Sequence, residues 1–109
     1  MPTMSTLVIN APKQRVGQGP TYKTFAETFA KGIGRDYAIS ENLAVQTSPR
    51  CTVVLLSKDE HKRAEGELVR LVRTVKAGNG IQRYDVHIKN LRMVSYKPES
   101  LNRNGVAVI

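Results

Sequence analysis

The sequence predicts an α+β fold, a small β-barrel of about five or six strands with two short helices. Short runs of β-branched and apolar residues recur along the chain, and turn residues separate them. A capping-box pattern marks one clear helix near the first third of the chain. The length of 109 residues, 40% of them hydrophobic, suits one modest core. We therefore expect residues 1–109 to form a single domain.

The first two elements follow from local signals. Residues 6–9 form a short apolar run that predicts a buried strand. Thr24 begins a T-F-A-E capping box, in which its hydroxyl and the Glu27 carboxylate satisfy free amides at the start of a helix. Gly32 and Gly34 are expected to end that helix.

A second helix and a second strand are predicted next. Ser40 can cap a short helical segment through Val45, and Pro49 prevents its continuation. The run CTVVLLS at residues 51–57 is apolar, β-branched and short, as strands are.

Residues 58–77 allow two interpretations. Read as a helix, the segment has a capping box at Ser57 and Glu60 and one apolar face. Gly66 in its middle and the repeated valines fit a strand pair with a charged hairpin better. We favour the hairpin.

Three more strands are expected towards the C-terminus. The runs YDVHIKNL, RMVSYK and GVAVI correspond to residues 84–91, 92–97 and 105–109. Asn90 is expected to separate the first two, and the turn-rich stretch PESLNRNG the last two.

The charge balance indicates a polyanionic partner. Seventeen Lys and Arg residues against nine Asp and Glu give a net charge of +8, with a sequence pI of about 10.0. Basic residues gain affinity for nucleic acids because each neutralised phosphate releases counterions. RNA or DNA is therefore the expected partner, with RNA preferred. No long apolar span or strongly basic amphipathic helix predicts membrane binding.

Cysteine usage and the N-terminal residues favour the cytoplasm. The chain has one cysteine, Cys51, so an internal disulfide is not expected, and MPTMSTLVINAP does not resemble a secretion signal. Cys51 at the start of an apolar run predicts a small buried or half-buried thiol. Together with His61 and His87 it makes no recognised ligand spacing, so neither a metal nor a cofactor is predicted.

The order of these elements resembles the YTH and EVE branch of the PUA-like superfamily. The resemblance covers Thr6 to Val72. It rests on the order of a strand, a basic loop, a helix ending in AKGI and a second short helical segment, followed by the strand VVLL, a turn and the strand GELV. Val53 to Ser57 followed by Gly66 is similar to the strand-turn-strand of that family. The resemblance implies a compact barrel with a pocket between the exit of the first strand and the end of the helix, where a flipped and often modified base binds. The family usually lines this pocket with tryptophans, and this chain contains none.

The candidate binding residues fall into three chemical groups. Tyr37 and Tyr84 offer rings that can stack on a base. Asn10, Ser40 and Asn42 can read a base edge through hydrogen bonds. The remaining candidates are cations for phosphate, which are Lys13, Arg15, Lys23 and Arg35 near the expected pocket and Arg63 and Arg70 on the hairpin.

Two alternatives come from other functional classes. A second resemblance, to PUA-like domains of the ASCH type, implies an amidohydrolase acting on a modified nucleoside, with Lys23, Thr24 and either Glu65 or Glu67 as the residues required. The other alternative is a non-catalytic adaptor in a larger protein assembly. No phosphate-binding loop of the G-x-x-x-x-G-K-[ST] type occurs in the sequence. The oligomeric state is left open.

Overall fold

The computed structural model describes residues 6–11, 24–39, 47, 50–74, 82–101 and 106–109. Six strands and one helix lie in these ranges. In chain order they are β1 (Thr6–Asn10), α1 (Phe25–Lys31), β2 (Ile33–Ala38), β3 (Thr52–Ser57), β4 (Lys62–Arg73), β5 (Arg83–Val94) and β6 (Val106–Val108).

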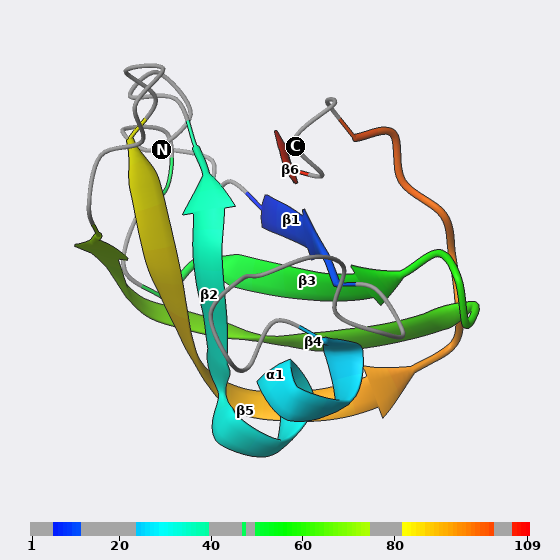
Figure 1. The fold of residues 1–109 in the computed structure, drawn as a ribbon. Coiled ribbons are helices and arrows are strands. Elements are labelled where there is room, and N and C mark those ends of the chain that lie inside the picture. The colour runs from blue at the N-terminus through cyan, green and yellow to red at the C-terminus, as the bar shows by residue number, and fades with distance from the viewer. Residues whose placement is uncertain (1–5, 12–23, 40–46, 48–49, 75–81, 102–105) are drawn as a thin grey trace, which may run out of the picture.

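All six strands belong to one mixed sheet, in the order β2-β5-β4-β3-β1-β6. The pair β1 and β3 is parallel, and the other neighbouring pairs are antiparallel. Figure 1 shows that the sheet is strongly curved, with β2 and the first part of β5 running across the direction of β3. The described strands leave β2 and β6 as edges, so the expected closed barrel is wrong and the sheet is an open, curved one.

The inner side of the curve holds the main core. Inward residues of the sheet, such as Leu7, Leu55 and Val86, pack there with Phe25 of α1. The opposite face of β1 and β3 is also buried, because Val8 and Leu56 pack against Tyr96 and Leu101 in the segment that follows β5. Figure 1 shows this segment running along one side of the molecule from β5 towards β6. The continuous apolar character of β1 and β3 reflects burial on both faces.

The helix begins at the predicted cap, Thr24, and ends at Gly32, one of the two glycines expected to end it. The Thr24 hydroxyl donates to the Glu27 carboxylate at 2.7 Å and accepts from the Glu27 amide at 3.3 Å. Gly32 ends the helix with φ 72°, and its amide donates to the Thr28 carbonyl at 2.8 Å. A Cβ at Gly32 would lie 2.8 Å from the Ile88 carbonyl oxygen, so both conformation and space require glycine. No helix in the described part of the chain is long and apolar enough to cross a membrane.

The hairpin prediction is confirmed, and the chain has an additional strand before it. β3 and β4 pair in register around a turn at residues 58–61. The additional strand, β2, begins directly after the helix cap, so Gly34 lies within a strand instead of ending the helix. Two residues of β2, Arg35 and Asp36, lie opposite Asp85 alone in the pairing with β5, which is a β-bulge. This bulge breaks the alternation by which a strand is recognised in sequence.

The C-terminal strands differ from the prediction at one point. β5 runs without interruption from Arg83 to Val94, so the expected division at Asn90 is wrong. Asn90 adopts φ 58° and forms, with Leu91, a bulge opposite Gly66 of β4. Asparagine tolerates this left-handed conformation, so it bends the strand without ending it.

Beyond β5, residues 95–101 form no strand, although RMVSYK was expected to be one throughout. The predicted last strand is confirmed as β6. The predicted helix from Ser40 to Val45 falls outside the described residues.

Candidate nucleic-acid interface

One side of β4, β5 and β2 carries a group of charged side chains of both signs. In β5 the buried residues Val86 and Ile88 alternate with Asp85, His87 and Lys89, which therefore face away from the core. We call this side the outward face. It carries the charged residues Arg35 of β2, Asp85, Lys89 and Arg92 of β5, and Glu65, Glu67 and Arg70 of β4, together with the imidazole of His87.

A cationic group surrounds His87 at one end of the outward face. Arg70 lies directly opposite His87 in the pairing of β4 with β5. Arg35 forms an ion pair with Asp85, with 3.5 Å between Nε and Oδ2. Partial burial lowers the pKa of His87, and the charges of Arg70 and Arg35 lower it further, against the opposing effect of Asp85. The His87 ring is thus harder to protonate than a free imidazole, and it lies beside two arginines.

The other end of the outward face contains carboxylates and a depression. Lys89 Nζ lies 3.6 Å from Glu67 Oε2, and the Asn90 side-chain amide donates to the same oxygen at 3.4 Å. Glu65 lies opposite Arg92 in the strand pairing. A depression of about 270 Å³ opens here, lined by Thr52, Glu65, Gly66, Glu67, Asn90 and Arg92.

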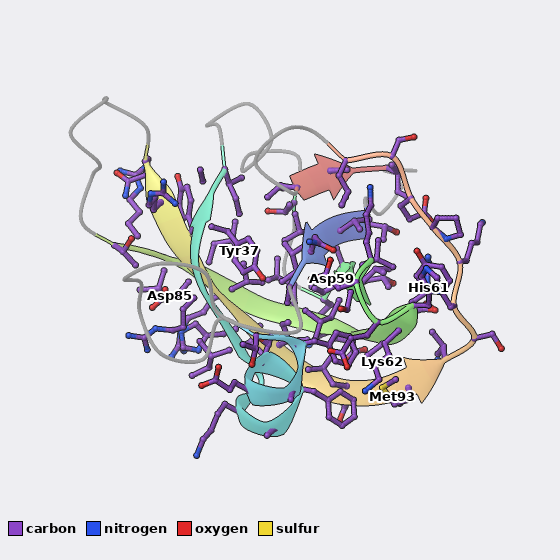
Figure 2. The ribbon with its side chains drawn as sticks, turned by 45° about the vertical axis from the view of Figure 1, so that its right-hand side comes forward. Tyr37, Asp59, His61, Lys62, Asp85 and Met93 are labelled. Carbon is purple, nitrogen blue, oxygen red and sulfur yellow. The ribbon has the colours of Figure 1, made fainter. Side chains whose placement is uncertain are left out.

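Both candidate stacking rings lie in the core. Tyr37 is 2% exposed and Tyr84 is 4% exposed, and they are opposite each other in the pairing of β2 with β5. The Tyr37 hydroxyl donates to the Asn10 carbonyl at 3.1 Å, and burial raises the pKa of Tyr37 well above its usual value. Figure 2 shows Tyr37 between β2 and β1, with Asp85 on the other side of β2. In this structure neither ring presents a face to a base.

Asn10 and Arg63 are engaged in structural contacts. The Asn10 side-chain oxygen accepts from the Lys58 amide at 3.2 Å, which ties the end of β1 to the β3–β4 turn. Arg63 is 9% exposed and donates to the Lys97 carbonyl at 2.9 Å and to Glu99 Oε1 at 3.0 Å. These bonds hold the segment after β5 against β4 and leave little of Arg63 available to a phosphate.

The turn next to Arg63 is anchored in a second way. The His61 and Tyr96 rings lie 5.1 Å apart, so the turn also contacts the segment after β5. Figure 2 shows His61 and Lys62 at this end of the molecule, far from Asp85.

The structure brings Arg35 and Arg70 together around His87, and the other predicted cations are either engaged or not described. Lys13, Arg15, Lys23, Ser40 and Asn42 lie outside the described residues. Thr24 caps α1 on the core side of the sheet, whereas Glu65 and Glu67 are on the outward face. The residues of the hydrolase alternative that the structure describes are therefore not brought together.

Sequence reasoning missed His87, Lys89 and Arg92 as members of a binding surface. The signal was present as strict alternation in YDVHIK, which places the polar residues of β5 on one face. The bulge at Asn90 then shifts this alternation by one residue and brings Arg92 to the outward face as well.

The described residues contain no group of three or more His, Cys, Asp or Glu side chains that could hold a metal ion. Cys51 is buried, as its apolar surroundings predict. No protein-family model, curated protein or solved structure matches this chain.

Proposed function

We propose that the chain binds nucleic acid through the outward face of β4, β5 and β2. The observation that carries this proposal is the group of cationic side chains, Arg35, Arg70, Lys89 and Arg92, on a sheet face with many exposed residues. Phosphate contacts from lysine and arginine provide most of the affinity of such proteins and fix their register on the strand. A net charge of +8 supports association with any polyanion.

RNA is the preferred ligand in this proposal, as the sequence predicts. The resemblance to PUA-like domains stays a prediction, and the proposed surface does not depend on it. An adaptor role within a larger protein assembly also stays a prediction.

The test is a binding titration with short labelled RNA and DNA, single-stranded and duplex, at two salt concentrations. The variant combines Arg70→Gln, Lys89→Gln and Arg92→Gln, which removes three exposed charges from the outward face. Each lost phosphate contact lowers the slope of log affinity against log salt by about 0.7 for single strands. We expect weaker binding to all sequences and a slope smaller by about 2 for single strands.

A matched control removes the same charge elsewhere. Lys58, Lys62 and Lys97 are exposed at the hairpin turn and in the segment after β5. Their triple substitution by glutamine should leave the slope close to that of the wild type. If both triple variants lost the same affinity and salt slope, overall charge would explain the effect, and an interface on the outward face would be contradicted.

A further inference from the structure

The depression on the outward face lies at a bulge in the pairing of β4 with β5. Gly66 of β4 lies opposite two residues of β5, Asn90 and Leu91, so one ladder position is disrupted. A Cβ at Gly66 would lie 2.7 Å from the Lys89 carbonyl oxygen and 2.8 Å from Ile88 Cγ2. Glycine therefore lets the two strands approach at the bulge, and the side chains around it form the rim of the depression.

The lining combines two carboxylates with three side chains that can donate hydrogen bonds. Glu65 and Glu67 present carboxylate oxygens, which only accept hydrogen bonds when ionised. Asn90 adds an amide, Thr52 a hydroxyl and Arg92 a guanidinium. Each carboxylate already has a cationic partner, since Glu65 Oε2 lies 3.8 Å from Arg63 Nε and Glu67 Oε2 lies 3.6 Å from Lys89 Nζ. Both side chains still retain exposed surface, 31% for Glu65 and 46% for Glu67. A ligand in this depression meets two carboxylates with room to accept further bonds.

This lining disfavours a phosphate and favours a base with an amino group. Two carboxylates repel a phosphate because like charges oppose each other at short range. The exocyclic amino groups of cytosine, adenine and guanine are donors, whereas uracil, like thymine, presents a carbonyl oxygen at the position of the cytosine amino group. A carboxylate accepts a hydrogen bond from the amino group and repels the uracil carbonyl oxygen.

The rim of the depression fits the path of a nucleic-acid strand. Lys89 and Arg92 are exposed beside the two carboxylates, and Arg70 lies further along the same face. Cations beside an acceptor-lined depression allow the phosphates to lie at the rim while one base points inward.

We propose that the depression between Glu65, Glu67 and Asn90 receives one unpaired base bearing an exocyclic amino group, with cytosine favoured over uracil. The inference rests on the proposed nucleic-acid binding and adds a base preference to it. The base must be unpaired because its amino edge is otherwise used in pairing.

The experiment compares oligocytidylate and oligouridylate of equal length by fluorescence anisotropy at one salt concentration. The wild type should bind oligocytidylate about tenfold more tightly, as expected for one good base-edge contact. In the double variant Glu65→Gln and Glu67→Gln, the ratio of the two affinities should fall towards one. Glutamine can donate to the uracil oxygen, so discrimination is lost even though the variant carries less negative charge.

Two further variants keep the result interpretable. Asp59→Asn with Glu60→Gln removes the same two charges at the hairpin turn and should change both affinities alike, with the ratio preserved. Asn90→Gly removes one amide from the rim, and glycine tolerates the left-handed conformation of this position. This variant should therefore fold and lower the ratio of the two affinities, even if the glutamate variant does not fold.

The possible failures are distinguishable. Equal wild-type affinity for the two oligonucleotides, or an unchanged ratio in both rim variants, overturns the base preference and leaves nucleic-acid binding in place. Absence of binding to either oligonucleotide overturns the proposed function and this inference together.

Discussion

Tyr37 connects two strands that are not neighbours in the sheet. Its ring fills the core next to β2, and its hydroxyl reaches the Asn10 carbonyl at the end of β1. Gly34 allows this arrangement, because a Cβ there would lie 2.9 Å from Tyr37 Cε2 and 3.1 Å from Ile9 Cδ1. At the residue scale, the Tyr37 side chain thus links β2 to β1, two strands that share no backbone hydrogen bonds.

The first prediction concerns the stability of Tyr37 variants. Tyr37→Phe should lose one hydrogen bond and about 1 kcal/mol of unfolding free energy. Tyr37→Ala should lose about 3–5 kcal/mol, because it also leaves a cavity in the core. Urea denaturation measures both. A stable Tyr37→Ala protein that has lost only nucleic-acid binding would show that the ring acts on the ligand and not in the core.

The second prediction concerns the pH dependence caused by His87. Its pKa is lowered in the folded protein from 6.5, so the unfolded chain binds more protons below about pH 6.5. The contribution of His87 to stability is therefore constant at higher pH and becomes unfavourable as the pH falls through this range.

Denaturation of wild type and His87→Gln across this pH range provides the measurement. The wild type should lose more stability on acidification than the variant. Nucleic acid bound beside His87 should oppose this effect, because nearby phosphates favour the protonated ring. Identical pH profiles for the two proteins would contradict the placement of His87 among the arginines.

The third prediction concerns Arg63, which fixes the segment after β5. Arg63→Gln removes the bonds to the Lys97 carbonyl and to Glu99, and should cost about 1.5–3 kcal/mol. Residues 95–101 should then be cleaved faster in limited proteolysis. Arg70→Gln is the matched control, because Arg70 is exposed and should leave both stability and cleavage unchanged.

At the level of elements, two bulges in the pairing of β4 with β5 shape the outward face. The bulge at Asn90 adds one residue to β5, and a second bulge at Val69 adds one to β4, so the register returns to its starting value. The two strands can therefore pair over almost their whole length while bending between the bulges. The depression lies at the first bulge and the His87 group beyond the second.

The fourth prediction tests the bulge through Gly66. Gly66→Ala should destabilise the fold by about 1–3 kcal/mol, because its Cβ meets a carbonyl oxygen that cannot move without shifting β5. Thermal or urea unfolding gives the value. Asn90→Gly on the opposite strand should cost less, because glycine adopts the same φ without strain. Equal costs would mean that the close contact at Gly66 relaxes freely.

At the level of the whole molecule, the elements predicted correctly from sequence were those with local signals. β1 and α1 were marked by an apolar run and by a capping box. The β3–β4 hairpin was marked by β-branched residues and Gly66. β2 was missed because a bulge breaks the alternation of its side chains. The open sheet was missed because its edge strands, β2 and β6, pair with strands that are distant in sequence.

The candidate site was predicted less well for the same reason. Arg35 and Arg70 lie on the outward face, but the burial of Tyr37 and the engagement of Arg63 depend on strands and segments far away in the chain. A single sequence shows that a residue is cationic or aromatic. It does not show which residue distant in sequence contacts that side chain in the folded protein.

The position of β1 has a consequence for the order of folding. β1 lies inside the sheet, paired with β3 on one side and with β6 on the other, and Thr6 exchanges backbone hydrogen bonds with Ile109 at 2.7 and 2.9 Å. Contacts so distant in sequence form slowly, whereas β3, β4 and β5 are joined consecutively as antiparallel neighbours. We expect pulsed hydrogen exchange during refolding to show protection in β3–β5 before β1, and simultaneous protection would contradict this order. Until residues 106–109 dock, the apolar strand at residues 7–9 has one unpaired edge, which is a site where two folding chains can associate.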